Sequence, residues 1–272
     1  MNWKKEFERC REYLAKNMKK SLPIVVGFNA NIDAVKYLTE DFVEYLGTNN
    51  SRKQAVKKLS DLGRGIRESI DSGEANEWEV DNQLVYNKLL EKGFDEERIG
   101  GQAGIVTNLM ARLGVKTNVL LPILSKKQAK FFVNRNVKVP VIERGKLRLR
   151  KPINAWNKNH PTRINCIFEF KKGFMGAPRS NRFILSYRPK GCKPIIDETI
   201  ILYSKKFMEN VKRVFLSGYQ LLDSEEEFRK AKSQLLFMQQ FSGNAKYHLE
   251  MTNVEDPRIR RLILKIGKEF NS

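Results

Sequence analysis

The chain has 272 residues, of which 41% are hydrophobic, so it can bury the core of a large folded domain and disorder is not expected. Lys and Arg number 51 against 31 Asp and Glu, a net charge of +20 that predicts an anionic partner: nucleic acid, a membrane surface or a phosphorylated metabolite. The three cysteines are widely spaced and contain no Cys-x-x-Cys pair, which indicates free thiols in a reducing compartment.

The basic side chains are scattered through amphipathic stretches, which is typical of solvated helix faces, so we do not expect nucleic acid as the partner. Residues 1–21 are charged and lack the apolar run of a secretory signal. No apolar run approaches the roughly 20 residues that a transmembrane helix needs. The sequence therefore predicts a soluble, cytoplasmic protein with no membrane partner.

Helices and strands are predicted to alternate through the first half of the chain. Apolar spacing of three and four residues predicts helices, and short β-branched runs predict buried strands. The predicted helices are 2–20, 51–72, 82–92, 102–113 and 125–133, and the predicted strands are 23–28 and 119–121. This alternation favours a parallel sheet with helices on both faces.

The period changes between residues 137 and 190. Strand-like pieces at 137–141, 147–150, 163–170 and 181–187 follow one another without helices, which predicts one small antiparallel sheet. Alternation then returns with helix 203–211, strand 214–217, helix 224–241, strand 247–251 and helix 256–268.

The predicted fold class is α/β, a doubly wound, mostly parallel sheet with a small inserted β-sheet lid. We assign residues 1–30, 49–72, 95–136 and 191–272 to the large domain. The lid takes residues 31–48, 73–94 and 137–190.

The first candidate site is the polar run from Gly27 to Asp33, at the end of the first predicted core strand. Ligands of open α/β sheets bind beyond the carboxyl ends of strands, and Asn29, Asn31 and Asp33 could bind sugar hydroxyls there. An Asx turn that caps the exit from the sheet explains the same residues, so both readings stay open.

The second candidate is Gly100-Gly101-Gln102 before a helix, where backbone N–H groups can approach an electronegative ligand closely. The run is neither a Walker A sequence nor a dinucleotide fingerprint, and a tight turn explains it equally well.

The third candidate is His248-Leu249-Glu250, whose His and Glu share one strand face and could orient a metal-bound water or a phosphate. A mutually satisfied polar pair is the simpler reading. With only His160 and His248 in the chain, a multi-histidine metal site is excluded.

Taken in order, several motifs resemble the archaeal ADP-dependent phosphofructokinases and glucokinases of the ribokinase superfamily, over residues 22–264. The motifs are Gly-Phe-Asn-Ala-Asn-Ile-Asp-Ala-Val from Gly27, Gly-Glu-Ala-Asn-Glu from Gly73, Ile-Gly-Gly-Gln-Ala-Gly-Ile from Ile99, Leu-Ser-Lys-Lys-Gln-Ala from Leu124, Phe-Leu-Ser-Gly-Tyr-Gln from Phe215 and His-Leu-Glu from His248. The resemblance implies a ribokinase-like domain and a β lid that close over a sugar. It also implies ADP as the phosphoryl donor, with Mg²⁺.

By resemblance, the sugar-binding set is drawn from the first two candidate sites and the lid. Its members are Asn29, Asn31, Asp33, Gly101, Gln102 and the lid acid Glu77, with Glu79 as an alternative to Glu77. Glu250 would help to organise Mg²⁺, directly or through water, with His248 nearby. A sugar phosphate needs cations that bind its phosphate group. The candidates are Lys158 and Arg188, with Arg182 and Lys190 as alternatives.

The family's pattern continues with Asn-x-x-Glu and then Gly-x-Gly-Asp, whose Asp is the catalytic base, and neither motif occurs after Glu250. The resemblance therefore implies a chain that is short at its C-terminal, nucleotide-binding end, with no catalytic residue of its own. A second polypeptide could supply the rest. We expect fructose 6-phosphate as the substrate, with glucose kept open by Glu77. The alternative is a non-catalytic basic binding or regulatory protein that retains the fold.

Overall fold

The chain folds into two compact units, as a computed structural model shows for residues 3–17, 22–49, 55–250, 254 and 256–269. Unit 1 comprises residues 1–30, 101–162 and 190–272, and unit 2 comprises residues 31–100 and 163–189. Each unit has its own six-stranded sheet with helices packed on it. The predicted α/β class is confirmed.

Unit 1 is a mostly parallel sheet with helices. Its strands are β1 (Ile24–Gly27), β6 (Thr117–Leu120), β7 (Val137–Glu143), β8 (Lys146–Arg150), β11 (Arg213–Leu216) and β12 (Lys246–Leu249). Its helices are α1 (Trp3–Asn17), α5 (Gln102–Arg112), α6 (Lys126–Ala129), α7 (Glu198–Leu202), α8 (Lys205–Met208), α9 (Glu225–Gln239) and α10 (Pro257–Glu269). The strand order is β12-β11-β1-β6-β7-β8, all parallel except β8.

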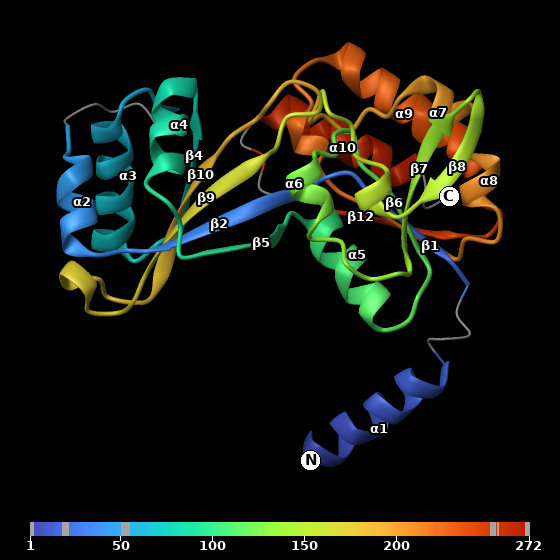
Figure 1. Ribbon diagram of the computed structural model, residues 1–272, viewed down its shortest axis with the longest axis horizontal. Coiled ribbons are helices and arrows are strands. Elements are labelled where there is room, and N and C mark those ends of the chain that lie inside the picture. Colours follow the sequence, from blue (N-terminus) through green and yellow to red (C-terminus); the bar gives the residue numbers. More distant parts are fainter. Residues whose placement is uncertain (1–2, 18–21, 50–54, 251–253, 255, 270–272) are drawn as a thin grey trace. The chain divides into compact units, whose positions relative to one another are not determined.

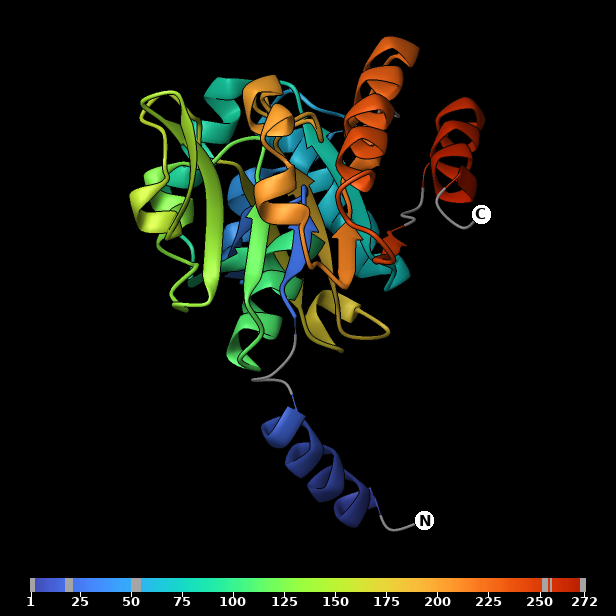
Figure 2. The ribbon, with the colours of Figure 1, turned by 90° about the vertical axis from the view of Figure 1, so that its right-hand side faces the viewer.

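Alternation along β1 explains the layers of unit 1. Ile24 and Val26 pack with Ala103 of α5, whereas Val25 joins the larger core that α9 and α10 complete on the other face. In Figure 2 the blue β1 runs between the green β6 and the orange β11, as the hydrogen-bonded register requires. A strand buried on both faces is continuously apolar, so the sequence of β1 shows no polar alternation.

Unit 2 is a mixed sheet covered by helices on one face. Its strands are β2 (Asn31–Tyr37), β3 (Ala55–Val56), β4 (Asn76–Val80), β5 (Glu96–Gly100), β9 (Ile164–Phe170) and β10 (Asn181–Ser186), in the order β3-β4-β10-β9-β2-β5. Its helices are α2 (Glu40–Leu46), α3 (Leu59–Ser72) and α4 (Gln83–Glu91), which gather beside the sheet in Figure 1.

Tight packing sets the helical face of unit 2. A Cβ on Gly65 of α3 would lie 2.6 Å from Phe183 and 2.7 Å from Trp78, so the helix backbone rests directly on these rings. Phe42 of α2 stacks on Phe168 of β9, with ring centroids 5.8 Å apart. The opposite face of the sheet carries Asp33 of β2 and its register neighbours, which are described with the site.

Three predicted boundaries are wrong. The segment 49–72, predicted in the large domain, belongs to unit 2, where Gly65 of α3 packs on aromatic side chains, and 95–100 join it because β5 pairs antiparallel with β2. Residues 137–162 belong to unit 1 because β7 pairs in parallel with β6. The four successive strands therefore do not form one antiparallel sheet: β7 and β8 extend the first sheet, and β9 and β10 lie in the second.

Element predictions differ at several points. The single helix expected at 203–211 is replaced by α7 and α8, which a turn at Tyr203–Ser204 separates. The helix expected from residue 51 begins at Leu59, after β3; residues 51–54 lie outside the described part of the chain. Strands β2, β4 and β5 and helix α2 were not anticipated. In the described ranges, none of the helices has the length and apolar character needed to cross a bilayer.

Candidate functional site

The carboxyl ends of β1, β11 and β12 form a candidate site in unit 1. Asn29 follows β1, and its carbonyl accepts a hydrogen bond from the Ala103 amide at 2.9 Å, which ties the strand exit to the first turn of α5. Gly218 follows β11 with φ of 94°, and a Cβ there would lie 3.1 Å from the Asn29 Cβ. The backbone at this edge is therefore closely packed around Asn29.

The glycine pair predicted before α5 is present, and Gly101 is the N-cap residue. Its φ of 70° and ψ of 148° lie in a region that only glycine adopts without strain, and no side chain caps the helix. The Ala103 amide of the first turn already donates to Asn29, so a ligand here would use the other first-turn amides and the helix dipole, which favours an electronegative group. The role of Gly101 and Gln102 in binding a substrate oxygen stays a prediction.

Glu250, just past β12, is the acidic group of this edge. Its backbone amide donates to the Leu216 carbonyl at 2.9 Å, which places it beside the end of β11. Burial raises the pKa of its carboxyl above the usual value, although the Gln102 side chain hydrogen-bonds to it. Its Oε2 is buried and has no partner within the described part of the chain.

An orphaned carboxylate oxygen fits a cation or a bound water. Mg²⁺ in nucleotide sites is held by one or two carboxylates together with phosphate oxygens and water, so a single Glu is compatible with it. The described residues contain no group of three or more His, Cys, Asp or Glu that could enclose a metal. Glu250 therefore fits an Mg²⁺ that is completed by phosphate and water.

His248 has a partner already. Its Nε2 accepts from Arg213 Nη1 at 2.9 Å, and its ring stacks on Phe215 with centroids 4.6 Å apart. Burial, with the nearby charges of Arg213 and Lys246, lowers the pKa of His248. The imidazole is thus neutral at pH 7 and held by an arginine, an arrangement that does not resemble a metal ligand.

A second candidate site lies in unit 2, on the face of its sheet opposite the helices. Asn31 Nδ2 donates to Asp33 Oδ1 at 2.6 Å, and Asn31 is 1% exposed. Gly100 is opposite Asn31 in the β2–β5 ladder, and a Cβ there would lie 2.2 Å from Asp33 Oδ1. The Asp33 carboxylate therefore rests on the glycine that directly precedes Gly101 in the chain.

The charge state of Asp33 reflects competing effects. Burial raises the pKa of its carboxyl above the usual value, and the Asn31 hydrogen bond and the charges of Arg98, Arg182 and Arg163 oppose that shift. Arg163 is itself 5% exposed. Arg98 also forms ion pairs with Glu96 and Glu169, so this face carries acids as well as cations.

Asn165 is a candidate that sequence reasoning missed. It is the register partner of Asp33 in β9, so both side chains project from the same face of the sheet. Its Oδ1 is buried and has no partner within the described residues. A buried acceptor without a donor is uncommon and is ready for a ligand hydroxyl. The signal in the sequence was a lone polar residue inside the apolar run of 164–168.

Glu77 and Glu79 of β4 differ in their contacts. Glu77 accepts a hydrogen bond from the Ser186 hydroxyl, and the register through Ile184, Ile167 and Val35 places it on the same sheet face as Asp33. Glu79 forms an ion pair with Arg188, with 3.3 Å between Oε1 and Nε. Glu77 is therefore the better candidate for a sugar hydroxyl.

The predicted cation cradle is only partly in the lid. Arg188 and the alternative Arg182 belong to unit 2, but Lys158 lies in unit 1, in an exposed turn after the 3₁₀ helix of Pro152–Asn154. The prediction of Lys158 as a lid residue is therefore wrong, because 137–162 follow β7 and β8 into the first sheet. Lys190 also falls in unit 1.

Comparison with known proteins gives one consistent result. Residues 22–272 match the family model described as the ADP-specific phosphofructokinase/glucokinase conserved region. The ADP-specific phosphofructokinase of Thermococcus litoralis is 30% identical over 97% of this chain and 61% of its own length. The ADP-dependent glucose/glucosamine kinase of Pyrococcus furiosus is 31% identical over 99% of this chain and 63% of its own.

A solved structure agrees with the sequence relatives. An ADP-dependent kinase in complex with fructose 6-phosphate and ADPβS superposes with a TM-score of 0.78, at 30% identity over 96% of this chain and 58% of that one. The chain thus spans about 60% of the length of the relatives it matches. By its motifs, its fold and these matches, the chain belongs to the ADP-specific phosphofructokinase/glucokinase family.

Proposed function

We propose that this chain is the sugar-binding part of an ADP-dependent kinase that phosphorylates fructose 6-phosphate, with glucose as an alternative substrate. The observation that carries the proposal is the pairing on one sheet face of Asp33, held by Asn31, with Asn165, whose buried oxygen lacks a donor. A carboxylate next to a free amide oxygen accepts hydrogen bonds from neighbouring hydroxyls, which is what a sugar offers. The relative solved with fructose 6-phosphate supports the substrate class.

We assign each residue a role from the polar groups that its contacts leave available to the sugar. Asn31, Asp33 and Asn165 bind sugar hydroxyls. Asn29 fixes the strand exit, and Gly101 with Gln102 present the start of α5 to the reacting hydroxyl. These groups orient the substrate, and orientation supplies much of the rate enhancement in phosphoryl transfer.

The choice between the two sugars depends on charge. Fructose 6-phosphate carries a phosphate dianion, for which Arg182 and Arg188 are the cations in unit 2 and Lys158 and Lys190 those in unit 1. Glucose lacks that group and needs hydroxyl acceptors instead, which favours Glu77. We infer that Glu77 sets the glucose affinity and the arginines set the sugar phosphate affinity.

Glu250 is the proposed link to the phosphoryl donor, ADP. When bound, Mg²⁺ would neutralise charge on the transferring phosphate. Glu250, oriented by Gln102, would hold that ion directly or through water. The catalytic base of the family lies in a Gly-x-Gly-Asp motif that this sequence does not contain. The proposed role of this chain is therefore substrate binding, and turnover needs a base from outside it.

Isothermal titration calorimetry of the purified chain tests the proposal, with fructose 6-phosphate, glucose and Mg·ADP as separate titrants. Binding of at least one sugar at millimolar concentration is expected, and Asp33→Ala should abolish it. Asp81→Ala is the matched control, because Asp81 is an exposed acid of unit 2 outside the proposed site. If the wild-type chain binds neither sugar, or if both variants lose binding equally, the proposed function is wrong.

A further inference from the structure

The sheet of unit 1 has a second charged region, at the amino ends of its parallel strands and opposite the carboxyl edge that carries Asn29 and Glu250. The loops that enter these strands are 112–116, 130–136, 209–213 and 240–246. Their charged residues are the cations Arg112, Lys116, Lys130, Arg135, Lys212, Arg213 and Lys246, and the acid Glu209. All of these side chains are exposed. The amino edge is thus strongly basic.

The sheet ladder itself arranges these cations in order. The Lys246 amide donates to the Lys212 carbonyl at 3.0 Å, and the Lys212 amide donates to Pro23 at 3.3 Å. On the other side of β1, the Ile24 amide donates to the Lys116 carbonyl at 3.0 Å. The next strand continues the line, because the Thr117 amide donates to Asn136, which follows Arg135, at 2.9 Å. We call Lys246, Lys212, Lys116 and Arg135 the amino-edge row.

The row spans five adjacent strands, β12 to β7. With strands about 4.8 Å apart, four intervals cover about 19 Å. None of its four side chains forms an ion pair with another described residue. Lys246 is in register with Arg213, so strand alternation directs Lys212 and Lys116 to one face of the sheet and Lys246 to the other. Unneutralised cations spread over both sides of an edge of this length fit a polyanion better than a single small phosphate, which would contact only one or two of them.

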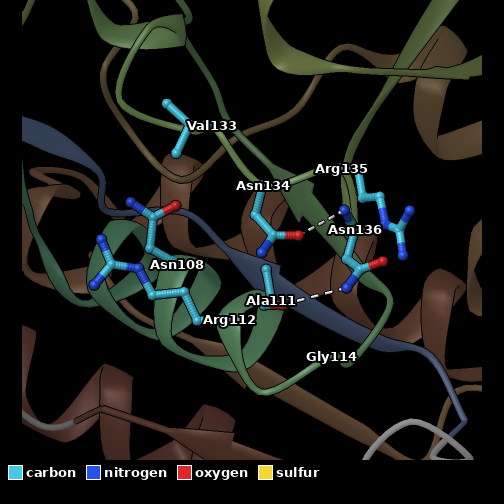
Figure 3. A pocket seen from close by; sticks show the side chains of 8 residues that line it. All are labelled: Asn108, Ala111, Arg112, Gly114, Val133, Asn134, Arg135 and Asn136. Carbon is cyan, nitrogen blue, oxygen red and sulfur yellow. Dashed lines mark hydrogen bonds between the residues drawn. The ribbon is translucent and has the colours of Figure 1, made fainter.

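A hollow of about 570 Å³ lies at the β7 end of the row. Figure 3 shows it between the last turn of α5 and the turn that leads into β7, with Asn108, Asn134 and Asn136 among its walls and Arg112 and Arg135 beside it. Asn136 Nδ2 donates to the Ala111 carbonyl at 3.2 Å, which fixes one wall. Asn108 Oδ1 is buried and has no partner within the described residues.

Amide side chains and an unpartnered acceptor suit the edge of a nucleobase, which offers donors and acceptors in one plane. Bases become available for such contacts in single strands, where they are not paired. We propose that the amino edge of the unit 1 sheet binds single-stranded nucleic acid, with phosphates along the amino-edge row and one base in the hollow. This surface lies at the edge of the unit 1 sheet opposite Asn29 and Glu250 and does not depend on the kinase assignment.

Fluorescence anisotropy with a short labelled single-stranded RNA, titrated with the full chain at several salt concentrations, tests the inference. The test variant is Lys116→Gln/Lys212→Gln/Lys246→Gln. The matched control is Lys57→Gln/Lys88→Gln/Lys172→Gln, which removes the same charge from exposed lysines of unit 2. Circular dichroism melting of both variants confirms that they are folded.

The wild type and the control should bind alike. The row variant should bind about tenfold or more weakly at moderate salt, and its logarithmic salt slope should be shallower by about 2, since each lost phosphate contact removes about 0.7. A separate variant, Asn108→Leu, should weaken binding without changing the salt slope, because it alters the hollow and no charge.

Three results would overturn the inference. The wild type could fail to bind the RNA at low salt. The control could lose as much affinity as the row variant, which would mean that net charge alone drives binding. Anionic lipid vesicles could bind in a row-dependent manner while RNA does not, which would assign the surface to a membrane.

Discussion

The two edges of the unit 1 sheet carry opposite kinds of site. At the carboxyl edge the groups are held in place. The backbone packs closely around Asn29, α5 starts at Gly101 without a side-chain cap, and Glu250 is half-buried. At the amino edge, the charged side chains extend into solvent and make few contacts. The first edge can orient a substrate because its geometry is fixed, whereas the second attracts charge and carries the hollow beside Asn108.

The largest expected difference between the edges comes from a pair of glycine substitutions. Gly101→Ala forces a side chain into the conformation with φ of 70° and ψ of 148° and should cost about 1–3 kcal/mol of unfolding free energy. It should also abolish sugar binding, because the start of α5 must shift. Gly114→Ala, at the amino edge with φ of 92°, should cost about 1 kcal/mol and leave sugar binding intact. Urea unfolding measures the free energy of unfolding, and calorimetry measures sugar affinity. Equal loss of sugar affinity in the two variants would contradict the difference between the edges.

The next effect concerns a single acid. Glu250→Gln should weaken Mg·ADP binding by tenfold or more, because the carboxylate with the unpartnered oxygen is the proposed ion ligand. Its stability should not fall, since burial already disfavours the charged form. Glu209→Gln removes an exposed acid from the opposite edge and is the control. Unchanged Mg·ADP affinity in Glu250→Gln would remove this residue from the proposed site.

The pH dependence of stability extends the contrast to the buried carboxylate of unit 2. Because burial raises the pKa of Asp33 in the folded chain, the folded state binds more protons than the unfolded state at pH values just above the ordinary carboxyl pKa. The Asp33 contribution is therefore least unfavourable at low pH and becomes more unfavourable as pH rises through the raised pKa.

Asp33→Asn removes this titration. Relative to the wild type, it should gain stability between pH 4 and pH 7. Urea unfolding at the two pH values measures the difference, and Asp81→Asn is the exposed control. A relative loss of stability over that interval would show that Asp33 is better stabilised as a charge than its burial indicates.

The smallest effect is expected at the amino edge. Neutralising Lys116, Lys212 and Lys246 together should change the free energy of unfolding by no more than about 0.5 kcal/mol, because exposed cations without ion pairs contribute little. Sugar affinity should also stay at the wild-type value. A large loss of stability in urea unfolding would mean that these lysines have a structural role.

The sequence predicted those parts of the molecule that local chemistry determines. The β1 strand, the capped helices at Asn82, Ser125 and Ser224, and the glycine start of α5 all follow from short patterns. The polar residues at the strand ends are site candidates because their types and order carry the family resemblance, and their binding roles stay predictions.

Long-range pairing was not accessible in the same way. The sequence of residues 95–100 predicts neither a helix nor a strand, because β5 is polar and exposed. The strand is stabilised by its hydrogen-bonded ladder with β2. The same limit hid Asn165, whose importance depends on its register with Asp33, and the amino-edge row, whose members are far apart in sequence. The cations of the amino-edge row are seen to be neighbours only when the strand order is known.

A crystal structure of the chain soaked with fructose 6-phosphate tests the central claim most directly. We expect density for the sugar against the face of β2 and β9 that carries Asp33, with one hydroxyl donating to Asp33 and another to Asn165 Oδ1. Sugar density elsewhere on the chain, with both of these side chains free of it, would contradict the account.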